Sequence, residues 1–187
     1  RDVERSRGLG DVYKRQVYKI DRKGKKMKLS NQPGTNSPIF SSSMKYFMNK
    51  FTSLDTPILI TLNDNTGKVL KTLVTNDKLK QKLAEYAIPQ KEFFTFKTTE
   101  GVDLNGWMMK PVNFDPAKRY PVLMFQYSGP GSQQVLDKWG ISWETYMASL
   151  GYVVACVDGR GTGGRGSEFQ KCTYLNLGVK EAKDQVE

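Results

Sequence analysis

The sequence predicts two unlike folded regions, an antiparallel β region followed by an α/β region. The first prediction rests on five short segments with β-type apolar patterns, separated by turn residues, between Val17 and Asn76. The second rests on two continuous apolar segments that flank a short helical pattern after Pro89, because such strands alternating with helices are typical of a parallel sheet covered on both faces. With 187 residues, 38% of them hydrophobic, the chain can form one or two such regions.

The first region is expected to be an antiparallel meander. Its expected strands are 17–20, 27–29, 45–51, 57–62 and 69–73. Loop residues such as Gln32-Pro-Gly34 lie between them, and strands this short and evenly spaced are typical of a propeller or a sandwich. Apolar residues at helical spacing then predict a helix over 77–86 that stops before Pro89. These boundaries make 17–76 the β region and 77–89 a linker.

The second region, 90–187, is expected to alternate strands and helices. A strand pair over 92–97 and 102–110 comes first, followed by a buried strand over 120–127. The helix expected over 143–150 ends at Gly151, a residue that readily adopts the conformation after a helix. The uninterrupted apolar run 152–157 then predicts a second buried strand, so this region is expected to be α/β.

The net charge of +10 is unevenly distributed along the chain. Residues 17–89 hold thirteen basic and five acidic side chains, whereas 90–187 hold eleven of each. Part of the excess lies around Gly24, where 22–28 reads as the tip of a hairpin. A solvated hairpin tip explains this cluster more simply than a phosphate-binding patch, so we expect no nucleic-acid partner.

Residues 1–16 lack apolar periodicity, and no hydrophobic stretch follows their arginines as it would in a signal peptide. Residues 6–16, SRGLGDVYKRQ, are the translation of a DNA sequence that resembles a transposon-end adapter used to prepare sequencing libraries. We therefore expect 1–16 to be an adapter artefact, with a natural arm as the alternative. On that interpretation, the natural N-terminus and any targeting signal precede the printed sequence.

No metal site or cofactor is expected. The sequence has no histidine, and Cys156 and Cys172 do not form a CxxC pair. The segment Gly161-to-Gly166 does satisfy the pattern GxGxxG of dinucleotide-binding loops. It stands three residues after its strand, however, and Glu168 would lie where a phosphate should bind. A sharp structural turn is the favoured interpretation, and nucleotide binding remains an alternative of a different functional class.

Four motifs in one order carry a family resemblance. They are Tyr120-Pro-Val-Leu-Met-Phe-Gln-Tyr-Ser-Gly-Pro-Gly-Ser-Gln, then Trp143-x-x-Tyr-Met-Ala-Ser-x-Gly-Tyr, then Asp158-Gly-Arg-Gly-Thr-Gly-Gly-Arg-Gly, and then Leu177-Gly-Val-Lys-Glu-Ala-Lys-Asp-Gln. Each motif is weak alone, but their order and spacing are specific. Together they resemble the dipeptidyl peptidase IV branch of the prolyl oligopeptidase serine peptidases, over essentially all of 17–187.

The resemblance implies the C-terminal part of a β-propeller in 17–76 and the N-terminal part of an α/β-hydrolase domain in 90–187. It also implies an exopeptidase that removes N-terminal X-Pro or X-Ala dipeptides through an acyl-enzyme, and a homodimer as the full-length protein. The sequence contains no GxSxG elbow, and in α/β-hydrolases the triad runs in the order Ser, acid, His. We expect all three residues to lie beyond Glu187, so this chain should be a truncated and inactive part of the enzyme.

The same resemblance implies a role for Tyr127. By its place in the motif, this tyrosine matches the family's oxyanion-hole donor, whose hydroxyl stabilises the charge that develops during acyl transfer. Gly129 and Pro130 form the tight turn that holds it, and Asp158 and Arg160 are expected to support the neighbouring glycine-rich loop.

Other members of the family remain open as alternatives. A prolyl tripeptidyl peptidase or an acylaminoacyl peptidase would share these motifs, as would a non-catalytic relative that has lost its serine. The resemblance favours a periplasmic, secreted or membrane-anchored setting, although the chain itself leaves the location unknown.

Overall fold

The computed structural model describes residues 12–187, and the chain divides into two compact units. The first contains the chain up to Glu85 together with Leu136–Gly140, and the second contains Tyr86–Val135 and Ile141–Glu187. The chain thus enters the second unit, returns to the first for five residues and enters the second again. Among the described residues, no helix combines the length and apolar character needed to cross a membrane.

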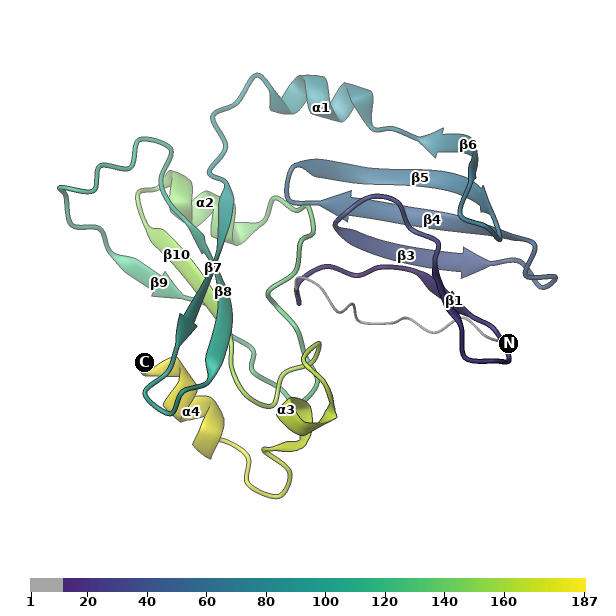
Figure 1. Cartoon of the computed structure of the whole chain (residues 1–187). Coiled ribbons are helices and arrows are strands. Elements are labelled where there is room, and N and C mark those ends of the chain that lie inside the picture. The colour runs from purple at the N-terminus through teal and green to yellow at the C-terminus, as the bar shows by residue number, and fades with distance from the viewer. Residues whose placement is uncertain (1–11) are drawn as a thin grey trace. The chain divides into compact units, whose positions relative to one another are not determined.

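An antiparallel four-stranded sheet forms most of the first unit (Figure 1). Its strands, in spatial and chain order, are β3 (Thr35–Phe40), β4 (Tyr46–Ser53), β5 (Thr56–Asp64) and β6 (Val69–Val74). The expected antiparallel meander is therefore confirmed for the strands predicted over 45–51, 57–62 and 69–73, with β3 as an additional strand, whereas the strands predicted over 17–20 and 27–29 lie outside this sheet. β3 contains Pro38, which lacks a backbone N–H, but as the outer strand of the four it accommodates this residue.

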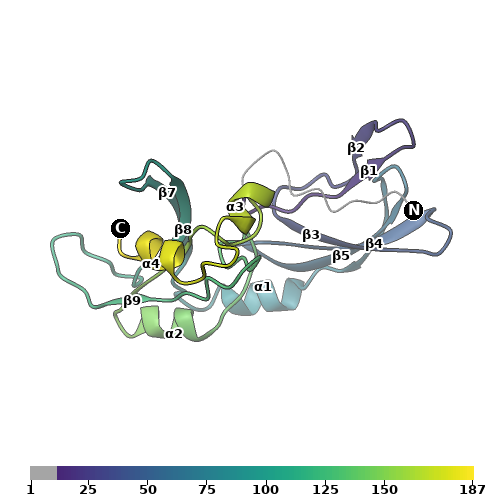
Figure 2. The same cartoon turned by 90° about the horizontal axis from the view of Figure 1, so that it is seen from below.

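The basic segment forms a separate two-stranded hairpin, which Figure 2 shows apart from the four-stranded sheet. It consists of β1 (Tyr18–Ile20) and β2 (Lys26–Lys28). In the turn, Asp21 Oδ1 accepts the backbone N–H groups of Lys23 and Lys25 at 2.8 and 2.9 Å. All side chains of 21–28 are exposed, as expected for a solvated tip. At the base of the hairpin, Val17 and Leu29 pack with Phe47 of β4.

Residues 12–16 lie next to β3. The backbone N–H of Arg15 donates to the carbonyl of Gly34, and the carbonyl of Arg15 accepts the N–H of Asn36, each at 2.9 Å. Residues 1–11 lie outside the described part of the chain. The adapter origin of 1–16 stays a prediction.

The helix after β6 is shorter than expected. α1 (Asp77–Leu83) ends before Tyr86 and contains no fully buried side chain. Leu79 and Leu83, which supplied the helical pattern, are only half-buried. Only seven residues are helical, so 84–89 complete the connection without helical structure.

A mixed four-stranded sheet forms the centre of the second unit. Its spatial order is β7 (Lys91–Lys97), β8 (Asp103–Met109), β10 (Val153–Asp158) and β9 (Val122–Met124). β10 runs parallel to β9 but antiparallel to β8, so the expected parallel sheet is only partly realised. All six residues of β10 are buried, which agrees with the continuous apolar pattern that predicted this strand.

The expectation of a buried strand over 120–127 was wrong in length and in burial. β9 spans only Val122–Met124, and Val122 is 64% exposed. Within the described residues, β9 pairs with β10 along one edge only, so its apolar side chains are incompletely covered. Tyr127 therefore lies in a loop three residues beyond the strand.

Three helices complete the second unit: α2 (Trp143–Ser149), α3 (Ser167–Lys171) and α4 (Val179–Gln185). α2 packs on β10 and β8, where Ala148 is fully buried. Trp143 also makes an edge-to-face contact with Phe125, with ring centroids 5.5 Å apart. Gly151, at φ +97°, follows the helix as its sequence position predicted.

Candidate functional site

Tyr127 lies in the loop that follows β9 and is 69% exposed. Its ring lies against Gly129 so closely that a Cβ atom at residue 129 would be 2.5 Å from the ring carbon Cε1. Any larger side chain at residue 129 would therefore have to displace the ring of Tyr127. The Gly129 carbonyl accepts the N–H and the hydroxyl of Ser132, at 3.0 and 2.6 Å, and these bonds close the turn around Pro130.

The glycine-rich loop after β10 is hydrogen-bonded directly to this turn. The N–H of Gly131 donates to the carbonyl of Gly161 at 2.9 Å, and the N–H of Gly163 donates to the carbonyl of Ser132 at 2.6 Å. Gly161 has φ +92°, a conformation that side chains with a Cβ rarely adopt. The two segments that the sequence singled out separately therefore form one pair of joined loops.

Asp158, the last residue of β10, fixes the chain just after the Tyr127 turn. Its carboxylate accepts the backbone N–H groups of Gln134 and Val135 at 2.8 to 3.0 Å. Burial raises the pKa of Asp158, and the two hydrogen bonds partly offset that rise. Asp158 thus anchors the chain beyond the turn, while Gly161 and Gly163 hold the turn itself.

Replacing Asp158 with alanine should loosen residues 134 and 135, because the buried N–H of Val135 and the partly buried N–H of Gln134 would lose their acceptor. We expect the free energy of local opening at Val135 to fall by about 2 to 4 kcal/mol, measured by hydrogen exchange in the complete protein. Asp115→Ala is the control, since Asp115 accepts an exposed N–H from Ala117. Equal exchange rates at Val135 in wild type and Asp158→Ala would contradict the anchoring role.

The same substitution should change how stability depends on pH. Because the pKa of Asp158 is raised in the folded state, the stability contributed by its protonated form is lost as the pH rises through the folded pKa. In Asp158→Ala, the free energy of unfolding should therefore lack the fall that Asp158 causes as the pH rises through its folded pKa.

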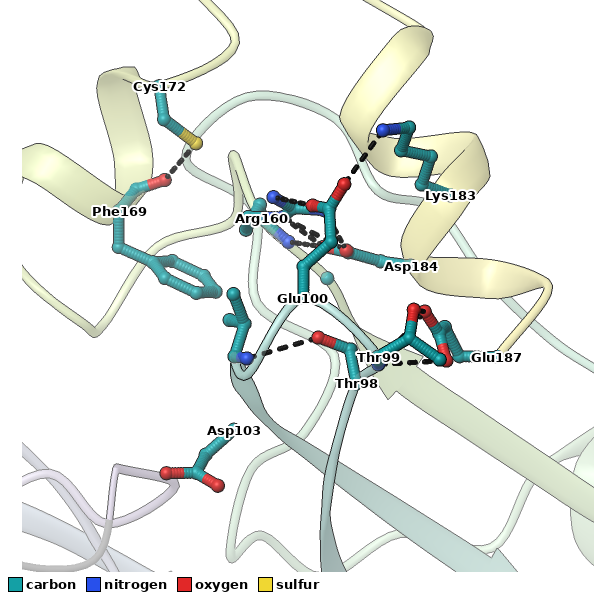
Figure 3. A network of polar contacts seen from close by, with 12 residues as sticks. Thr98, Thr99, Glu100, Asp103, Arg160, Phe169, Cys172, Lys183, Asp184 and Glu187 are labelled. Carbon is teal, nitrogen blue, oxygen red and sulfur yellow. Dashed lines mark hydrogen bonds and ion pairs between the residues drawn. The ribbon is translucent and has the colours of Figure 1, made fainter.

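Arg160 connects three parts of the second unit (Figure 3). Its guanidinium contacts Asp184 of α4 through Nη2, 2.6 Å from Oδ1, and Glu100 of the β7–β8 turn through Nη1, 2.7 Å from Oε2. Its backbone N–H also donates to Asp184 Oδ2 at 2.6 Å. The hydrogen bonds with Asp184 and Glu100 raise the pKa of Arg160 further above its ordinary value. Lys183 is the second cation on Glu100, at 2.7 Å.

Sequence reasoning selected Arg160 but missed its partners Asp184, Glu100 and Lys183. Asp184 is 24 residues from Arg160 and Glu100 is 60 residues away, so no local spacing could have paired them. One signal in the sequence could have indicated this pairing. Asp184 is an acidic residue in a segment with a helical pattern, and a helix that packs on the sheet buries one of its faces. The Asp184 side chain is only 1% exposed, and buried carboxylates are nearly always paired.

The glycine-rich loop does not have the geometry of a dinucleotide site. The helix that follows it, α3, has only five residues. The Gly161 N–H donates to the Phe169 carbonyl and the Gly163 N–H to Ser132, so both amides are already engaged. The Arg165 side chain stacks on Phe169 and donates to the Asp103 carbonyl. Protein groups thus already occupy two N–H donors and the arginine that a phosphate could otherwise contact in this loop.

Pro130 also borders an apolar cavity of about 600 Å³ in the second unit. The other residues around it come from α3 and the segment that follows, namely Gln170, Lys171, Thr173, Tyr174, Leu175 and Leu177. The Tyr127 turn thus contributes Pro130 to the wall of this cavity and is also hydrogen-bonded to the glycine-rich loop.

Two family models match the chain. One describes the prolyl oligopeptidase family and matches residues 139–187. The other describes the N-terminal region of dipeptidyl peptidase IV and matches residues 6–58. The two matches fall in the second and first structural units respectively, apart from residues 139–140, which belong to the first unit.

Known proteins of similar sequence and structure agree with these matches. The chain is 51% identical to the crystal structure of Porphyromonas gingivalis dipeptidyl peptidase 4, with a TM-score of 0.89 over 94% of this chain and 25% of that one. It is 39% identical to the probable dipeptidyl peptidase 4 of Emericella nidulans over 79% of its length. It is 43% identical to dipeptidyl peptidase 4 of Trichophyton equinum over 65% of its length. The chain spans 20% and 16% of these two curated relatives.

The motifs, the mostly antiparallel sheets and these similarities define the class of protein. The chain belongs to the prolyl oligopeptidase family of serine peptidases. Within that family it is a member of the dipeptidyl peptidase IV branch.

Proposed function

We propose that the chain is part of a serine exopeptidase that removes X-Pro or X-Ala dipeptides from the N-termini of peptides. In this proposal, 17–76 belong to a β-propeller, 77–89 link the two regions and 90–187 begin an α/β-hydrolase domain. The complete enzyme is proposed to act as a homodimer. The observation that carries the proposal is the joined pair of loops that presents Tyr127 beyond the sheet edge.

Tyr127 would stabilise the transition state of acyl transfer. When a nucleophile attacks the scissile carbonyl, negative charge develops on the carbonyl oxygen, and a fixed donor at that position lowers the barrier. The hydroxyl of the exposed Tyr127 side chain would be such a donor, and its loop is held by the hydrogen bonds of Ser132 to the Gly129 carbonyl and of Gly131 to the Gly161 carbonyl. Preorganisation of this kind is effective because the donor needs no reorientation during the reaction.

The 187 residues contain no histidine and no GxSxG elbow. The nucleophile, the acid and the histidine of the proposed reaction would therefore come from other parts of the complete polypeptide. This chain alone should hydrolyse no dipeptidyl substrate.

The proposal is tested by recovering the complete gene and assaying its product on chromogenic peptides. We expect Gly-Pro-p-nitroanilide and Ala-Ala-p-nitroanilide to be cleaved at least about tenfold faster, in kcat/KM, than Ala-Ala-Pro-p-nitroanilide or N-acetyl-Ala-p-nitroanilide, a difference of about 1.4 kcal/mol in transition-state binding. The 187-residue chain is the negative control. Preference for the tripeptide or the acetylated substrate would assign one of the related specificities instead. No cleavage of any of them would overturn the proposal.

A further inference from the structure

We propose that Glu100, in the turn between β7 and β8, is a positioning residue for Tyr127. The inference rests on the proposed oxyanion role of Tyr127, and the structure links the two residues through Arg160 and the glycine-rich loop.

The first link is the turn itself. The N–H of Gly101 donates to the carbonyl of Thr98 at 2.8 Å, and the N–H of Val102 donates to the Thr98 hydroxyl at 3.1 Å, so the turn is a closed and defined structure. Figure 3 shows this turn facing α4 and Arg160, with Thr99 hydrogen-bonded to the carboxylate of Glu187. Glu100 therefore lies in a turn whose backbone is hydrogen-bonded on both sides of it.

The second link is the ion-pair cluster. Glu100 contacts Arg160 and Lys183, one with each carboxylate oxygen and both at 2.7 Å. These two hydrogen bonds hold the pKa of Glu100 below its ordinary value, so the residue is ionised at neutral pH. Arg160 is 12% exposed and Asp184 only 1%, whereas Glu100 is 41% exposed. Glu100 is thus the more exposed of the two carboxylates that form ion pairs with the largely buried Arg160.

The third link runs through the backbone. Arg160 lies directly between Gly159 and Gly161, and the Gly161 carbonyl accepts the N–H of Gly131 in the Tyr127 turn. On the other side, the ring of Tyr127 lies against Gly129. A shift of Arg160 would thus be transmitted to the turn through short, directed contacts. Since a misplacement of about 1 Å can cost about a hundredfold in rate, a small shift suffices to affect a transition-state donor.

The complete enzyme offers a matched pair of substitutions. Glu100→Gln removes the charge at nearly constant size, and Glu92→Gln does the same at Glu92, which pairs with Lys110 at 2.7 Å and contacts neither loop. We expect Glu100→Gln to lower kcat on Gly-Pro-p-nitroanilide about tenfold with KM nearly unchanged, because a displaced Tyr127 would weaken its hydrogen bond to the oxyanion, which forms only in the transition state. Glu92→Gln should leave both constants within about twofold.

A double-mutant cycle with Tyr127→Phe identifies the route of the effect. If Glu100 acts through the Tyr127 hydroxyl, Glu100→Gln should change kcat by less than about twofold once that hydroxyl is absent. An equal tenfold loss in both backgrounds would overturn the positioning role, as would an unchanged kcat in Glu100→Gln alone.

Failure of the proposed function has a different signature. If Tyr127→Phe alone leaves kcat unchanged, the oxyanion assignment fails, whatever Glu100→Gln does. If Tyr127→Phe lowers kcat and Glu100→Gln does not, only the positioning role of Glu100 is excluded. A thermal melt of each variant separates lost catalysis from lost folding.

Discussion

Tyr127→Phe in the complete enzyme is expected to lower kcat by about 10²- to 10³-fold, the usual loss when one oxyanion-hole donor is removed. The substitution deletes only the hydroxyl, so the ring that packs against Gly129 is retained. KM should change by less than about threefold, because the developing oxyanion exists in the transition state and not in the bound substrate. Steady-state kinetics on Gly-Pro-p-nitroanilide provide the measurement.

Tyr146→Phe is the matched control for this change. Tyr146 lies on α2 and is 64% exposed, a value close to that of Tyr127, but it is not part of the joined loops. Tyr146→Phe should leave kcat within about twofold of the wild-type value, because substitutions at exposed positions outside a site usually have small effects. A similar kcat in Tyr127→Phe and wild type would show that another group stabilises the oxyanion.

The second large effect is expected from Asp184→Ala. This change removes the main partner of Arg160 and leaves a charge that is nearly nine-tenths buried with only Glu100 opposite it. Removing one member of a buried ion pair typically costs about 3 to 5 kcal/mol. We expect the lower end, about 3 kcal/mol, because Arg160 keeps one ion pair and some contact with water.

Hydrogen exchange at the amides of 161–163 in the complete protein would measure this loss as a lower free energy of local opening. Lys97→Met serves as the control, since Lys97 and Asp103 form an ion pair in which both side chains are more than half exposed. That variant should change local stability by less than about 1 kcal/mol. If the two variants exchange alike, the Arg160–Asp184 pair is not what holds the loop.

The parts of the fold that the sequence predicted are those with a strong local pattern. β10 was expected because five of its six successive buried positions, 153–157, form a continuous apolar run. β3 was not expected because Thr-Asn-Ser-Pro-Ile-Phe contains residues typical of turns, and its strand conformation comes from pairing with β4. The mixed direction of the second sheet depends on β8 pairing antiparallel with β10, more than 40 residues away, which no local pattern encodes.

In the candidate site, too, the sequence predicted the residues that lie in local motifs and not the contacts between distant segments. Tyr127, Gly129, Pro130, Asp158 and Arg160 lie within recognisable motifs, whereas Asp184 and Glu100 acquire their importance only when folding brings them to Arg160. The hydrogen bond between Gly131 and Gly161 likewise joins residues 30 positions apart. Motifs located the two loops, and the three-dimensional structure shows that they are one assembly.

The return of Leu136–Gly140 to the first unit has a consequence for dissecting the protein. Within that unit, the Asp137 carboxylate accepts the N–H of Leu54 at 2.8 Å, and its carbonyl accepts the hydroxyl of Thr35 at 2.7 Å. A piece ending at Glu85 would lack these acceptors, although the chain up to that point contains every strand of the first sheet. A protease that cut once between the units would leave two polypeptides still held together by this five-residue insertion. The first unit is therefore discontinuous in sequence, and no single cleavage point yields it intact.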